Sequence, residues 1–211
     1  MSRRSFTAAL TLSFAVAVTL SGCSAVSSVT HPTAAAGTTA AAGTASAAGT
    51  TSAAANADLF TAPAIDQALQ ALAKKVGASP MKVLQIAVYP DYVSVEAADP
   101  AKPTEVNKFT YRDGGVEDPR PVKLTTTGSD DPGAVLKANL FDSSEVKPEV
   151  LAKVIAGAAA ESKIDGAKTG EAVIKRNLPF SSTIQIFVNV SGTRADKQVR
   201  ATLDGKVTEV S

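Results

Sequence analysis

The chain has very few of the side chains that carry out most enzymatic chemistry. Among its 211 residues there is no tryptophan, one cysteine (Cys23) and one histidine (His31). Residues 58–211 therefore contain no thiol and no imidazole. Their absence excludes disulfides, Ser-His-Asp catalysis and histidine or cysteine metal sites from that region. We expect no catalytic residue, no metal and no cofactor there.

Charge is also scarce in part of the chain. No charged residue occurs between Ser5 and Ala57, a stretch that includes His31, and the whole chain has 21 basic against 20 acidic residues. Nucleic-acid binding needs a clustered basic surface, so this balance argues against a nucleic-acid partner. The sequence also offers no polybasic patch for anionic lipid head groups.

The N-terminus has the pattern of a bacterial export signal. Arg3 and Arg4 precede an apolar run, residues 8–20, which is shorter than the roughly 20 apolar residues that span a bilayer. The run ends in Leu-Ser-Gly-Cys at residues 20–23. This tetrapeptide resembles the lipobox of bacterial lipoproteins, which implies cleavage after Gly22 and attachment of lipid to Cys23. The alternative is a plain secretory signal with an incidental cysteine.

Residues 1–22 are therefore expected to be a lipoprotein signal peptide, and the lipid to hold the protein on the outer face of the cell membrane. Residues 2–6, Ser-Arg-Arg-Ser-Phe, also resemble a twin-arginine signal, so general and twin-arginine export both stay open. Residues 23–57 are expected to be the lipidated cysteine and a disordered Ala/Thr/Ser/Gly tether. The tether spans roughly 30 Å as a flexible coil.

Residues 58–211 carry one succession of patterns twice, in copies of about 58–137 and 138–211. Each copy begins with apolar residues at helical spacing, preceded by a candidate N-cap: Thr61 in the first copy, and Ser143 or Ser144 in the second. Pro63 and Pro148 suit the first turns. The apolar positions are Ile65, Leu69, Leu72 and Val76, then Val150, Leu151, Val154, Ile155 and Ala158.

Strand patterns follow each helix. They cover residues 82–89, 92–97, 106–112 and 120–125, then 172–178, 183–190, 198–203 and 206–210. In the first of them, Leu84, Ile86 and Val88 are expected on one face. Asp-Gly pairs at 113–114 and 204–205 predict type I′ turns. Residues 126–137 are expected to join the copies.

The predicted fold is α+β, with two tandem α-β-β-β(β) repeats and an antiparallel sheet that has helices packed on one face. Two unrelated α+β segments are the alternative. The element order over residues 58–211 resembles the PepSY-like exported domains and the tandem-repeat beta-lactamase inhibitory proteins. The resemblance implies a protein-binding or inhibitory module without catalysis. Unlike those inhibitors, this domain has no disulfide and no tryptophan, so it does not specifically imply a beta-lactamase target.

The open face of such a sheet is the candidate binding surface. Six residues are the partner-binding candidates, namely Tyr89, Tyr92, Lys108, Arg112, Phe187 and Arg200. Tyrosine and arginine are enriched among residues that dominate interfaces. We expect an exposed Phe187 beside the tyrosines to form an apolar patch with a polar rim. The alternatives are a merely solvated face, or a one-residue register shift that turns Phe187 into the core.

These expectations favour a non-catalytic surface lipoprotein that binds a protein or cell-wall component through the open face. The alternative is a carrier of lipid or a small amphiphile, with an apolar cavity between helices and sheet. The least favoured alternative is an enzyme that uses carboxylates.

The acidic residues Asp130, Asp131, Asp142 and Glu145 are candidates for calcium binding. Their spacing is not that of an EF-hand, which favours a solvated loop.

Overall fold

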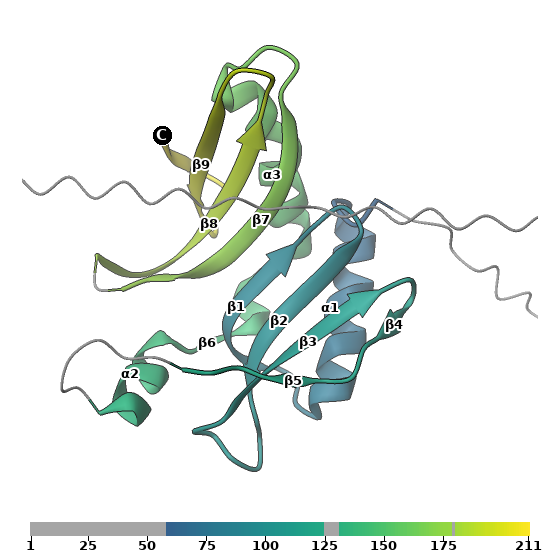
Figure 1. Ribbon diagram of the computed structural model, residues 1–211, viewed down its shortest axis with the longest axis vertical. Helices are drawn as coiled ribbons and strands as arrows, with labels where there is room; N and C mark the ends of the chain where they lie inside the picture. Colours follow the sequence, from purple (N-terminus) through teal and green to yellow (C-terminus); the bar gives the residue numbers. More distant parts are fainter. Residues whose placement is uncertain (1–57, 125–130, 179) are drawn as a thin grey trace, which may run out of the picture. The chain divides into compact units, whose positions relative to one another are not determined.

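A computed structural model describes residues 58–124, 131–178 and 180–211 (Figure 1). Cys23, His31 and the rest of the expected signal peptide and tether lie outside the described residues. The described chain is an α+β fold with three α-helices and a ten-stranded sheet in which every pairing is antiparallel. The predicted fold class and the antiparallel sheet are therefore confirmed.

The helices are α1 (Ala62–Val76), α2 (Pro132–Asn139) and α3 (Pro148–Ser162). The strands are β1 (Lys82–Val88), β2 (Tyr92–Ala98), β3 (Val106–Arg112), β4 (Gly115–Val116), β5 (Arg120–Pro121), β6 (Phe141–Asp142), β7 (Lys168–Asn177), β8 (Ser181–Ser191), β9 (Asp196–Thr202) and β10 (Val207–Val210). Their order across the sheet is β10-β9-β8-β7-β1-β2-β3-β4, while β5 pairs with β3 and β6 with β1. The two strand runs thus meet at the β1–β7 pair.

The ends of α1 agree with the sequence pattern, whereas the start of α3 does not. Thr61 is the N-cap of α1, and Gly77 ends it in the left-handed region at φ +80°. For α3 the serine caps are wrong, because the N-cap is Lys147. Ser143 and Ser144 instead belong to a short 3₁₀ turn, residues 143–145, and Pro148 then starts the α-helix without needing a backbone donor.

The longer strands lie close to where the alternation predicts them, but β7 begins four residues earlier than expected, the strand expected over residues 120–125 covers only Arg120–Pro121, and β6 was not predicted. The register of β1 against β2 shifts between Val83 and Gln85, so a bulge puts Val83 in the core and leaves Leu84 on the other side. The expectation that Leu84 shares a face with Ile86 is therefore wrong. The expected joint, residues 126–137, is partly helical because α2 starts at Pro132, while residues 125–130 lie outside the described residues.

The two Asp-Gly turns differ in type. In the first, Asp113 and Gly114 both have positive φ (52° and 78°) and form a two-residue loop, as predicted for type I′. In the second, only Gly205 has positive φ (86°), and its N–H donates to the carbonyl of Thr202. The type I′ prediction is wrong for the second turn, whose loop is longer and lets Leu203 pack against the core.

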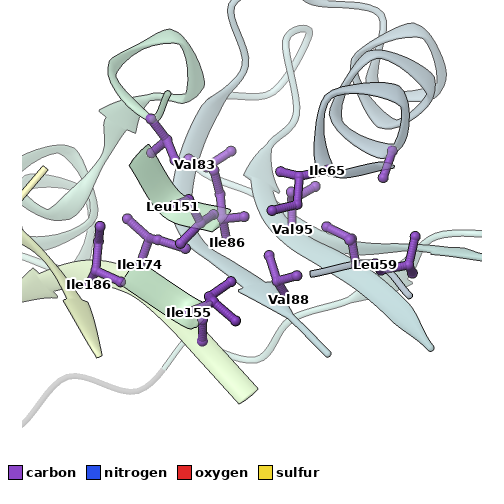
Figure 2. Packing of buried hydrophobic residues seen from close by; sticks show 14 of the residues in the cluster. Leu59, Ile65, Val83, Ile86, Val88, Val95, Leu151, Ile155, Ile174 and Ile186 are labelled. Atoms are coloured by element: carbon purple, nitrogen blue, oxygen red, sulfur yellow. The ribbon is translucent and has the colours of Figure 1, made fainter. Parts of the chain in front are cut away.

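The hydrophobic core draws side chains from helices and strands alike (Figure 2). Helix α1 contacts β2 and β3, helix α3 contacts β7, β8 and β9, and the two helices contact each other. Ile65 of α1 and Leu151 of α3 are fully buried in the same cluster as Ile86 and Ile174. Ile86 lies opposite Ile174 in the β1–β7 pair, so the core runs without a break across this junction.

Replacing Ile174 by alanine is expected to lower the free energy of unfolding by about 2–5 kcal/mol, because it opens a cavity where the two strand runs meet. Urea denaturation followed by circular dichroism measures the loss. Gln67→Ala, on the exposed side of α1, is the control and should change stability by less than about 0.5 kcal/mol. Equal effects of the two substitutions would contradict a continuous core.

Candidate functional site

Side chains that point away from the core line a hollow on the opposite face of the sheet, over β1, β7, β8 and β9. We call it the central hollow; its volume is about 420 Å³. It forms because the β1–β7 pairing places Gln85 opposite Lys175, and the β8–β9 pairing places Phe187 opposite Arg200. Its lining residues are Gln85, Tyr89, Glu171, Val173, Lys175, Asn177, Phe187, Asn189, Gln198 and Arg200.

A chain of hydrogen bonds crosses the hollow and ends at Arg200. The Asn189 amide donates to the Glu171 carboxylate at 2.6 Å, and the Gln198 amide donates to the Asn189 side-chain oxygen at 3.0 Å. The Arg200 Nε donates to the Gln198 oxygen at 3.3 Å, and its Nη1 forms an ion pair with Glu209 at 2.7 Å. The guanidinium is thereby held in one orientation before any partner binds.

Phe187 lies on the predicted face but is not exposed. Only 5% of the residue is accessible, and it is absent from the core cluster, so the expected exposed patch and the alternative of a core-facing ring are both wrong. Lys175 and Arg200, from the strands on either side of β8, each place their charge 5.7 Å from the ring centroid. Their aliphatic stems and charged ends cover the ring, which forms a buried floor.

The structure brings together three other candidates in a column beside the hollow. Tyr89 and Tyr92 stack with their ring centroids 4.1 Å apart, and the Arg112 guanidinium lies 4.5 Å above the Tyr92 ring. Asp91 pairs with Arg112 at 3.3 Å and anchors the end of the column. Lys108, the remaining candidate, lies on β3 opposite Glu96 of β2 and does not line the hollow.

The Glu171 carboxylate connects this column to the hydrogen-bond chain. Hydrogen bonding to Glu171, helped by burial and by Tyr92, raises the pKa of Tyr89 well above its ordinary value. Sequence reasoning missed Glu171 because the expected strand began at Ala172, whereas β7 begins at Lys168. The sequence does contain a signal for an earlier start of this strand, because Glu171, Val173 and Lys175 alternate with apolar residues.

A second, smaller hollow lies between α2 and the sheet. This α2 hollow has a volume of about 250 Å³ and shares Gln85 and Lys175 with the central hollow. Its apolar lining consists of Leu84, Leu124, Pro132, Val135 and Leu136. The carrier hypothesis predicts an apolar cavity between helices and sheet. The α2 hollow, with its apolar lining, is a candidate for that cavity.

The acidic residues considered for calcium have other roles where they are described. The Asp131 side chain caps α2 by accepting from the Gly133 N–H at 3.0 Å. Asp142 pairs with Lys82 at 2.9 Å, and Glu145 accepts from the Asp142 N–H at 3.1 Å. Among the described residues, no group of three acidic, histidine or cysteine side chains is placed to hold a metal ion.

No protein-family model, curated protein or solved structure matches this chain. In the part of the chain that the structure describes, none of the helices has the length and apolar character needed to cross a membrane.

The Tyr89 phenol should ionise well above the ordinary tyrosine pKa of about 10. The difference between the phenolate absorbance titrations of the wild type and Tyr89→Phe isolates this group. In Glu171→Gln its midpoint should fall toward 10, because the charge and the strongest acceptor are lost. A raised pKa in the folded state stabilises the protein below pH 10, and this stabilisation is lost as pH rises through the folded pKa. A wild-type midpoint near 10 would contradict the Tyr89–Glu171 interaction.

Proposed function

We propose that this protein is a lipid-anchored surface lipoprotein of a bacterial envelope, without catalytic activity, that binds a protein or cell-wall component through the open face of its sheet. The central hollow is the observation that carries the proposal. It presents arginine, lysine, tyrosine and amide groups in fixed positions on a rigid sheet, the arrangement that specific recognition needs.

The repeat architecture supports this proposal. The order α1-β1-β2-β3-β4 recurs as α3-β7-β8-β9-β10, and the strand order runs outward in both directions from the antiparallel β1–β7 pair. Two copies of one unit related by a two-fold axis would give this order. We propose that the chain is such a tandem repeat, with α1 and α3 packed on one face. The other face, apart from the part beside α2, is then left for a partner.

The chemistry of the hollow favours binding over catalysis. Among the described residues, Glu171 is the one carboxylate that lines it, and this group accepts a hydrogen bond from Asn189 and lies beside the Tyr89 hydroxyl. Acid–base hydrolysis of the glycosidase type needs two carboxylates across a substrate. The rest of the lining consists of apolar, amide, phenol and cationic groups, which bind and orient a partner but do not supply such a pair.

The location is proposed from the N-terminal sequence. Cys23 is the single thiol of the chain and follows the signal pattern directly, and the Ala/Thr/Ser/Gly composition of residues 24–57 is that of a linker between an anchor and a domain. A diacylglyceryl-type anchor carries two chains, enough for stable attachment where one chain gives only marginal binding.

Replacing Cys23 by serine should release the protein from the membrane, because the lipid has no thiol to join. In a bacterial host that processes lipoproteins, the wild type should sediment with membranes and incorporate a labelled fatty acid, and Cys23→Ser should do neither. Ser24→Ala, next to the cleavage position, is the matched control and should behave as wild type. Fatty-acid labelling that persists in Cys23→Ser would contradict the anchor.

A photo-crosslinking amino acid at Tyr92, on the open face, should give one defined adduct in intact cells. The same amino acid at Lys74, on the exposed side of α1, should give none, since that surface is not expected to contact the partner. An adduct at Lys74 alone would place the binding surface elsewhere. If Tyr92 gives no adduct and the purified protein carries bound lipid, the carrier function favoured by the α2 hollow replaces partner binding.

A further inference from the structure

The charges of the central hollow identify the chemical group that it binds. We infer that the hollow receives a carboxylate from an acidic side chain of the partner, held between Lys175 and Arg200. This inference rests on the proposed partner-binding function and adds the chemistry of the contact. It is carried by two cations that converge on one buried aromatic ring in the same hollow.

The charges of these two cations are balanced to different degrees within the described residues. Lys175 and Arg200 each lie 5.7 Å from the Phe187 ring centroid. Arg200 is paired with Glu209, but no carboxylate of the described residues lies within 4 Å of the Lys175 ammonium. An acidic group that enters the hollow therefore meets a lysine whose charge no carboxylate of the described residues offsets within that distance.

Hydrogen-bond donors remain available around the same point. Arg200 uses Nε for Gln198 and Nη1 for Glu209, so Nη2 is left to donate. The Lys175 ammonium has three N–H donors, and the side-chain amides of Gln85 and Asn177 line the same hollow. These groups match a carboxylate, which accepts several hydrogen bonds on two oxygens.

The surroundings select a singly charged group. Because Glu209 offsets Arg200, Lys175 is the cation of the lining that no carboxylate of the described residues balances within 4 Å, and a singly charged carboxylate neutralises it; a doubly charged phosphate would leave excess negative charge facing Glu171. The lining is mostly polar, so a ligand of this hollow is held mainly by charge and hydrogen bonds, while Val173 is the apolar side chain beside the covered Phe187 ring. The hollow therefore fits an acidic side chain better than an inorganic or lipid phosphate.

Two blocked tripeptides test this inference, acetyl-Gly-Glu-Gly-amide and acetyl-Gly-Gln-Gly-amide, which differ by one carboxylate. Nuclear magnetic resonance titration of the full-length protein in mild detergent follows the amides of Gln85, Asn177, Asn189 and Gln198. The Glu peptide should shift these signals and bind about tenfold more tightly than the Gln peptide, since hydrogen bonds to a charged group are the stronger ones. Inorganic phosphate should bind more weakly than the Glu peptide.

Lys175→Gln should remove most of the preference for the Glu peptide, while Lys153→Gln, on the exposed side of α3, should keep it. Unchanged amide signals elsewhere show that both variants are folded. Equal binding of the two peptides, stronger binding of phosphate, or a preference that survives Lys175→Gln would each overturn the inference. If the Glu peptide fails while the Tyr92 adduct persists, partner binding stands and the carboxylate alone is rejected.

Discussion

The antiparallel pairing of β1 with β7 is the contact on which the rest of the structure depends. It consists of four residue pairs, from Gln85 opposite Lys175 to Val88 opposite Ala172, and it turns two strand runs into one sheet. Because side chains alternate between the two faces of the sheet, the same pairing positions side chains both in the core and on the open face. On one side it buries Ile86 against Ile174 in the common core; on the other it brings Gln85 and Lys175 into the central hollow.

The two sides of this junction tolerate change differently. The core side depends on apolar area, which is not directional and accepts substitutions that keep volume. The hollow depends on directed contacts between the runs: Tyr89, which follows β1, interacts with Glu171 of β7, which accepts from Asn189 of β8. Each partner must arrive at hydrogen-bond distance, so the hollow adds directed contacts to the register that burial of the core face already specifies.

Sequence periodicity predicted α1, α3 and the longer strands, because these follow from local spacing alone, but it did not predict α2 or β6. It failed where the outcome depends on a neighbouring strand. The bulge that turns Leu84 away from the core is defined by pairing with β2, and the burial of Phe187 depends on Lys175 of β7 and Arg200 of β9. The network around Glu171 needs three strands in register, which a single sequence does not reveal.

The open face also shows why the unbalanced positive charge lies in the second strand run and not in the first. Each run has an aromatic residue opposite an arginine, Tyr92 with Arg112 and Phe187 with Arg200. In the first run Arg112 lies on the ring and pairs with aspartate and glutamate, so its charge is balanced within the chain. In the second run Lys175 adds a further cation against the ring, and Arg200 alone of the two pairs with a carboxylate of the described residues. Unbalanced positive charge is therefore concentrated beside β7, which is where a ligand of opposite charge gains most from binding.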